Sequence, residues 1–110
     1  MAKPPSLLRR PNDPPMLLLT SLASGPKHGY ALLKDIEEFA GVTLSPGTLY
    51  GAITRLEELG LIEPLTGVDR RQPYQLTAAG ASVLREVTAQ MRRLADVGAS
   101  RLRLTGGAGL

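Results

Sequence analysis

The sequence LSPGTLYGAITRLEELG at residues 44–60 has the features of a short helix with a defined start and a defined end. Ser45 is a favourable N-cap, and Pro46 suits the first helical position because that position needs no backbone N–H. Gly60 can end the helix in a left-handed turn. One face repeats apolar side chains at helical spacing and is expected to pack into a core; its members are Leu49, Ile53, Leu56 and, at its edge, Leu59.

The opposite face of this helix carries short polar side chains and a single long cation. A helix that only faces water would be expected to carry several Lys and Glu residues there. Small side chains let a helix approach DNA closely, and hydroxyl and guanidinium groups can hydrogen-bond to phosphates and bases. We therefore interpret this face as a recognition surface, with a plain structural helix as the alternative; the candidate contacts are Ser45, Gly47, Thr48, Tyr50, Thr54 and Arg55.

Composition predicts one globular domain. The chain has 110 residues, of which 43% are hydrophobic and 21% are charged, values typical of a folded protein. Because it has no cysteine, it can form neither disulfides nor thiolate metal sites. The single histidine, His28, has no cluster of further ligands, so we expect a helix-start residue and no metal or other cofactor. The sequence also lacks a nucleophile–base set and a phosphate-binding glycine loop, which argues against an enzyme.

The sequence predicts neither membrane insertion nor export. Its longest strongly apolar run, around residues 16–23, is too short to span a bilayer and lacks the layout of a cleavable signal peptide. We therefore expect a cytoplasmic protein. The net charge of +3 suits a nucleic-acid partner, but residues 14–77 carry five cations and seven anions. A DNA-binding function must therefore rest on individual arginines and not on bulk charge.

The N-terminal part of the chain is expected to form an arm followed by a buried helix. Residues 1–13 are proline-rich and basic, which predicts a flexible arm. Asp13 can cap a helix that enters through two prolines and continues to about Ala23. Because leucines occupy most sides of this helix, it should be buried. The sequence SGP at residues 24–26 is a strong signal for the end of this helix.

A second helix is expected from His28 or Gly29 to about Ala40. Its apolar set is Tyr30, Leu32, Leu33, Ile36 and Phe39, whereas Lys34, Asp35, Glu37 and Glu38 should face water. Together with the helix that starts at Ser45, it forms a helix-turn-helix.

After Gly60 the pattern changes to that of two short strands. Residues 61–65 and 72–76 read as the strands of a hairpin whose connection contains Gly67 and two candidate phosphate contacts, Arg70 and Arg71. A basic hairpin directly after a helix-turn-helix indicates a winged helix. The alternative for the two arginines is a solvated turn. Of the tyrosines, we expect Tyr30 and Tyr74 in the core and Tyr50 near a DNA phosphate.

The last helix is expected over residues 78–104, with Thr77 as its cap. Its length is about 40 Å at about 1.5 Å per residue. The small winged helix-turn-helix at residues 14–77, called the head below, cannot cover an apolar stripe of that length alone. A second copy of the chain is therefore the expected partner, through Leu84, Val87, Met91, Leu94 and Leu102. The glycine-rich tail at residues 105–110 is expected to be disordered. The predicted fold is thus mainly α with a small β-hairpin: a winged helix-turn-helix at residues 14–77 and one long helix.

Three parts of the sequence resemble the PadR-type transcriptional regulators. Residues 25–30 (GPKHGY) match the family's turn into its second helix. Residues 44–50 (LSPGTLY), 55–57 (RLE) and 60–62 (GLI) match its recognition helix and the exit from it. The end of the wing and the start of the last helix match at Tyr74, Leu76, Thr77 and Gly80. The resemblance covers about residues 16–104.

The resemblance implies a homodimeric, sequence-specific DNA-binding regulator, usually a repressor, of the small subgroup with one C-terminal dimerisation helix. Such a dimer would read an inverted-repeat operator in double-stranded DNA. It also implies a small-molecule effector near the dimer region, but the sequence has no Trp or stacking pair there, so the ligand and its existence stay open. Two departures bear on affinity: Gly51 stands where the family commonly has Pro, and Thr54 where it often has Lys.

A second function class stays open at this point. A winged helix can serve as a protein-interaction module without binding DNA, because the fold itself does not require DNA. The acidic balance of residues 14–77 favours that alternative, whereas the set of Thr48, Tyr50, Arg55, Arg70 and Arg71 favours DNA. The sequence-based hypothesis is the DNA-binding regulator.

Overall fold

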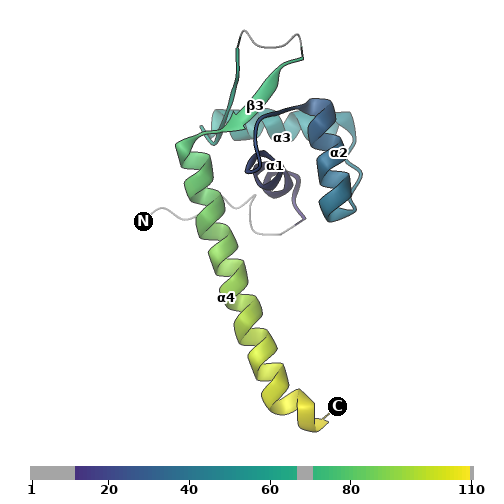
Figure 1. Ribbon diagram of the computed structural model, residues 1–110, viewed down its shortest axis with the longest axis vertical. Helices are drawn as coiled ribbons and strands as arrows, with labels where there is room; N and C mark the ends of the chain where they lie inside the picture. Colours follow the sequence, from purple (N-terminus) through teal and green to yellow (C-terminus); the bar gives the residue numbers. More distant parts are fainter. Residues whose placement is uncertain (1–11, 67–70, 110) are drawn as a thin grey trace.

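Seven helices and strands make up the described part of the fold, which contains both the predicted winged helix-turn-helix and the predicted long C-terminal helix (Figure 1). The computed structural model describes residues 12–66 and 71–109. In chain order the elements are α1 (Pro14–Leu22), β1 (Lys27–His28), α2 (Gly29–Ala40), α3 (Pro46–Glu58), β2 (Ile62–Pro64), β3 (Pro73–Leu76) and α4 (Ala78–Gly109). The prediction of a mainly helical winged helix with one long C-terminal helix is confirmed. The arm expected at residues 1–13 lies outside the described residues, apart from Asn12 and Asp13.

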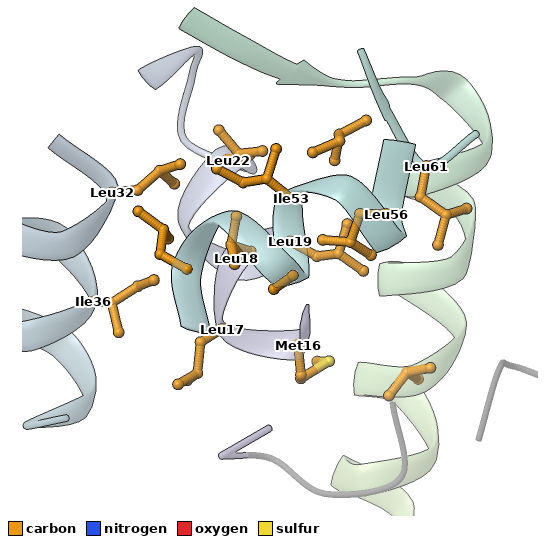
Figure 2. Close-up of a cluster of buried hydrophobic side chains, with 14 residues drawn as sticks. Met16, Leu17, Leu18, Leu19, Leu22, Leu32, Ile36, Ile53, Leu56 and Leu61 are labelled. Atoms are coloured by element: carbon orange, nitrogen blue, oxygen red, sulfur yellow. The ribbon is translucent and has the colours of Figure 1, made fainter. Parts of the chain in front are cut away.

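Helix α1 is the centre of the head, between α2 on one side and the start of α4 on the other (Figure 1). Its leucines are almost entirely buried, as its all-round apolar pattern predicts. They pack against the inward faces of α2 and α3 in an aliphatic core that Figure 2 shows. The fully covered side chains of this core include Leu18, Leu19, Leu32, Ile36, Leu49 and Leu56.

The ends of α2 and α3 are set by the residues that the sequence indicated. His28 caps α2, since its Nδ1 accepts a hydrogen bond from the Ala31 backbone N–H at 3.4 Å. Gly41 follows with a left-handed φ of 67°. Ser45 caps α3 through the Thr48 N–H at 3.1 Å, and Gly60 follows that helix with φ 74°. These local signals fix where the two helices of the helix-turn-helix begin and end.

Helix α1 starts differently from the expectation. The Asp13 side chain makes no capping hydrogen bond; its backbone oxygen accepts from the Leu17 N–H at 3.0 Å instead. The reason is that Pro14 and Pro15 have no N–H to be capped, so the first turn has little need of a side-chain acceptor.

Asp35 was expected to face water, but its side chain is only 32% exposed and bonds to neighbouring elements. Its carboxylate accepts a 2.6 Å hydrogen bond from the buried Ser21 hydroxyl and lies 4.0 Å from the Lys27 ammonium. Lys27 in turn donates to the Ser21 carbonyl and, at 2.7 Å, to the Ser24 hydroxyl. The sequence could not show this because the group joins α1, β1 and α2 only after they pack.

The predicted hairpin is formed by β2 and β3, and β1 adds a third antiparallel strand, so that the strand order of the wing is β1–β3–β2. Lys27 pairs with Tyr74 and His28 with Pro73, so the edge added by β1 ties the start of α2 to the wing. On the other side, Ile62 pairs with Leu76. Strand β1 escaped the sequence analysis because two polar residues carry no strand periodicity.

Helix α4 begins on the head and then leaves it as an isolated rod (Figure 1). Val87 is buried in the core of its own chain, and Leu84 and Met91 pack partly against that core. The prediction that Val87 forms part of an intermolecular seam is therefore wrong, because the first turns of α4 are needed to close the head. The helix continues to Gly109, and the disorder expected for residues 105–110 stays a prediction. Extending an existing helix orders one residue for each hydrogen bond gained, which favours continuation past Leu104.

Gly80 joins α4 to the head through a very close backbone approach. A Cβ built on Gly80 would overlap the backbone carbonyl of Leu61. Thr77 holds this joint from both sides: its hydroxyl donates to the Gly60 carbonyl at 2.7 Å and accepts from the Gly80 N–H at 3.0 Å. The prediction that Thr77 caps α4 is confirmed.

Gly80→Ala is expected to lower the free energy of unfolding by about 1–3 kcal/mol, because the added methyl group must push α4 off the Leu61 backbone. Chemical denaturation measures this change. Gly51→Ala is the matched control, since a Cβ on that helical glycine meets no atom within 4 Å. Equal stability of the Gly80 variant and the wild type would show that the joint is loose.

Candidate nucleic-acid interface

The outward face of α3 is held in place by its own N-cap. The Ser45 hydroxyl accepts from the Thr48 N–H and donates to the Thr48 Oγ1 at 2.9 Å. Ser45 therefore orients Thr48 and has no hydroxyl hydrogen left for a partner. Further along the same face, Thr54 Oγ1 donates to the Tyr50 carbonyl at 3.0 Å, so this hydroxyl also keeps only acceptor capacity. Arg55 is exposed and is the long cation of the face.

Two glycines make this face unusually flat. Gly47 and Gly51 are exposed, and a Cβ on either one would meet no atom within 4 Å. Packing within the chain thus gives no reason for glycine at these positions. Gly51, in the interior of α3, costs about 1 kcal/mol of helix stability relative to alanine; Gly47 lies in the first turn of the helix. A surface that must come very close to a partner's backbone or groove accounts for both.

The wing contributes Arg71, which is exposed two residues before the start of β3. Arg70, the second candidate of the turn, lies outside the described residues. Gln72 stabilises the end of the β2–β3 pair next to the turn by donating from Nε2 to the Leu65 carbonyl at 2.7 Å.

A cleft of about 220 Å³ lies where α2, α3 and the wing meet. All three tyrosines of the chain line it, although they come from three different elements: Tyr30 from α2, Tyr50 from α3 and Tyr74 from β3. The remaining lining residues are His28, Gly29, Arg71 and Gln72. Tyr50 closes against the start of α2, because a Cβ on Gly29 would lie 2.9 Å from its Cζ atom.

The three tyrosines differ from their predicted roles. Tyr30 is 63% exposed, so its expected place in the core is wrong; at the first turn of α2 its side chain lies at the edge of the cleft, with the Lys34 ammonium 5.7 Å from its ring centre. Tyr74 packs partly against the core, as expected. Burial, the Glu57 carboxylate and Tyr50 raise the pKa of Tyr74, which keeps its phenol protonated as a hydrogen-bond donor.

Sequence reasoning placed only Tyr50 and Arg71 at this surface and missed the cleft itself. The pairing of β1 with β3 brings His28 and Tyr74 together, and β1 was not predicted. The excess of tyrosine over phenylalanine is a signal in the sequence: the chain has three tyrosines and one phenylalanine, and hydroxyl-bearing rings suit partly wet sites.

The distal half of α4 presents a second surface. Leu94 is 75% exposed and Leu102 is 66% exposed, and Val97 and Leu104 are exposed as well. Leu94, Gly98 and Leu102 follow each other at four-residue spacing and share one face of the helix. Among the helices that the structure describes, none has the length and apolar content needed to cross a bilayer.

Comparison with known proteins identifies the family. The profile of the Transcriptional regulator PadR-like family matches residues 18–86. A crystal structure of a PadR family transcription regulator from Clostridium difficile R20291 superposes with a TM-score of 0.71 at 26% identity, over 81% of this chain and 97% of that one.

Two curated relatives are longer than this chain. An uncharacterized 37.1 kDa protein in transposon TN4556 of Streptomyces fradiae is 47% identical over 85 residues, which is 77% of this chain and 25% of that protein. The transcriptional activator GvpE2 of Halobacterium salinarum is 31% identical over 68 residues, 62% of this chain and 35% of that protein. The chain thus spans about a third or less of these relatives. With its winged-helix head and the family profile over most of that head, the chain belongs to the PadR-like family of transcriptional regulators.

Proposed function

We propose that the protein is a homodimeric repressor that places α3 in the major groove of double-stranded DNA. The observation that carries this proposal is the outward face of α3. Two glycines and two threonines, whose side chains hydrogen-bond within the helix region, leave room there for close approach beside one exposed arginine. Arg55 is the candidate base contact, Thr48 and Thr54 border it, and Arg70 and Arg71 of the wing are candidate phosphate contacts.

The homodimer is supported by the apolar side chains on distal α4. Leu94 and Leu102 are large, exposed and on one helical face, and the head of the same chain does not reach them. Two copies packed along this face would bury both rows of leucines. A two-fold dimer would read an inverted repeat whose half-sites lie about 34 Å apart, one turn of the duplex.

Repression is the proposed sign of regulation because blocking a promoter requires only occupancy of the operator. The relative GvpE2 is an activator by name, so the sign is a property to measure. A bound effector that changes the angle between the two heads would relieve repression, and no described residue identifies its chemistry. The proposal includes a cytoplasmic location, because the proposed partner is DNA.

The test of DNA binding is a titration of duplex DNA at several salt concentrations. The proposal is supported if the logarithm of the binding constant falls linearly with the logarithm of the salt concentration, because neutralising phosphates releases counterions. Footprinting on the DNA upstream of its own gene would then locate an operator. A protein that binds no duplex at low salt would favour the alternative, a winged-helix module that binds other proteins.

Gly51→Ala separates the two uses of α3. The substitution should raise the free energy of unfolding by up to about 1 kcal/mol, since alanine favours a helix and the site has space for a methyl group. At the same time it should weaken DNA binding, because that methyl group stands on the face that approaches the groove. Thermal unfolding and a binding titration on the same preparation measure both. A variant that gains stability and binds DNA as tightly as the wild type would remove Gly51 from the interface.

A further inference from the structure

We propose that the cleft between α2, α3 and β3 holds one phosphate of the DNA backbone, bound by the hydroxyls of Tyr50 and Tyr74 together with Arg71. This inference rests on the proposed DNA-binding function and assigns a binding role to Tyr74, which the sequence analysis placed in the core.

The first argument is the chemistry of the lining. The hydroxyls of Tyr50 and Tyr74 make no hydrogen bond within the part of the chain that the structure describes. Tyr74 stays protonated because burial and the nearby Glu57 raise its pKa, so it offers a donor and not an anion. Arg71 lines the same cleft and adds a positive charge. Two phenol donors and a guanidinium favour an anionic occupant with several acceptor oxygens.

The second argument is the start of α2, which forms one wall of the cleft. The positive end of a helix dipole attracts anions, and α2 has 12 residues. His28 strengthens this wall, because its Nδ1 accepts the Ala31 N–H and its ring proton is therefore carried by Nε2. Nε2 is thus a donor on a residue that lines the cleft.

The third argument is size and position. A cleft of about 220 Å³ is below the roughly 300–1,000 Å³ of sites that hold drug-sized ligands, and it is open to solvent. Tyr50 lies four residues before Thr54 on the same side of α3, so the cleft borders the face of α3 proposed to enter the groove. A duplex docked on that face would bring its backbone past the cleft, between α3 and the wing. A phosphate is the group that fits the place, the charge and the volume.

The experiment removes single hydroxyls and single phosphate charges. Tyr50→Phe and Tyr74→Phe keep the rings, and Thr88→Val is the matched control because its hydroxyl bonds only to α4 carbonyls, at 2.8 Å to Leu84. Binding is measured on a duplex that the wild type selects from a random pool. Each tyrosine variant should bind about tenfold or more weakly, as expected for a hydrogen bond to a charged group, with an unchanged melting temperature. The control should bind like the wild type.

Methylphosphonate substitution, one backbone position at a time, then locates the phosphate. One neutralised position in each half-site should weaken wild-type binding and cause little further loss in Tyr50→Phe or Tyr74→Phe. Gly29→Ala should mimic Tyr50→Phe with the hydroxyl still present, because its methyl group displaces the Tyr50 ring.

The outcomes distinguish this inference from the proposed function. The phosphate site alone would be overturned if the wild type selects and binds a duplex and both tyrosine variants bind that duplex, and each methylphosphonate form of it, as tightly as the wild type does. The phosphate site would also be overturned if, at every backbone position, the loss of affinity caused by the tyrosine substitution and the loss caused by methylphosphonate were additive. Failure of the wild type to bind any duplex would overturn the DNA-binding function, and the phosphate site with it.

Discussion

Leu94→Glu is expected to convert the protein into monomers and to weaken its binding to an operator by two orders of magnitude or more. The side chain is 75% exposed and lies beyond the part of α4 that packs on the head, so the substitution leaves the fold of one chain intact. In a dimer, however, the carboxylate would be buried in an apolar seam, where an unpaired charge costs several kcal/mol. A monomer loses the second head, which in the dimer acts at an effective concentration of about millimolar.

Leu94 is a better position for this test than Met91, because Met91 packs partly against the core of its own head. Ala89→Glu is the matched control, since it adds the same charge to an exposed position on another side of α4. Sedimentation measures the assembly, circular dichroism the helix content, and a titration with the footprinted duplex the affinity. A monomeric variant that still holds the operator as tightly as the wild type would show that dimerisation does not serve DNA recognition.

Arg55→Ala is expected to remove sequence preference and to cost about 1–3 kcal/mol of specific binding if the guanidinium makes a bidentate contact with a base. Arg55 is the long cation on the outward face of α3, where Gly51 and Thr54 leave it room to reach a base edge. Binding to unrelated DNA should change much less, because one charge among several phosphate contacts is lost.

Titrations of the operator and of a scrambled duplex at matched salt concentrations measure the two effects separately. Arg92→Ala is the control, since it removes an exposed cation from α4, away from the head. If the Arg55 variant lost affinity for both duplexes to the same extent, its role would be a phosphate contact and another residue would read the sequence.

The local signals of this chain were readable from the sequence because they act over a few residues. The cap at Ser45, the cap at Thr77 and the left-handed glycines Gly41 and Gly60 each satisfy or redirect neighbouring backbone groups. The all-round apolar pattern of α1 likewise predicted its burial, and helical spacing identified the buried face of α3. These signals are enough to predict a helix-turn-helix with a wing, and with it the outward face of α3.

Only the tertiary structure decided how distant residues meet. Val87 is buried within its own head because the hydrophobic core extends to the first turns of α4. A heptad pattern alone cannot distinguish packing within one chain from packing against a second chain. Asp35 is drawn to Ser21 and Lys27 across three elements. The two-residue strand β1 has no periodicity, yet its pairing with β3 brings His28 and Tyr74 to one cleft. Such contacts depend on packing between elements, which spacing along one element does not encode.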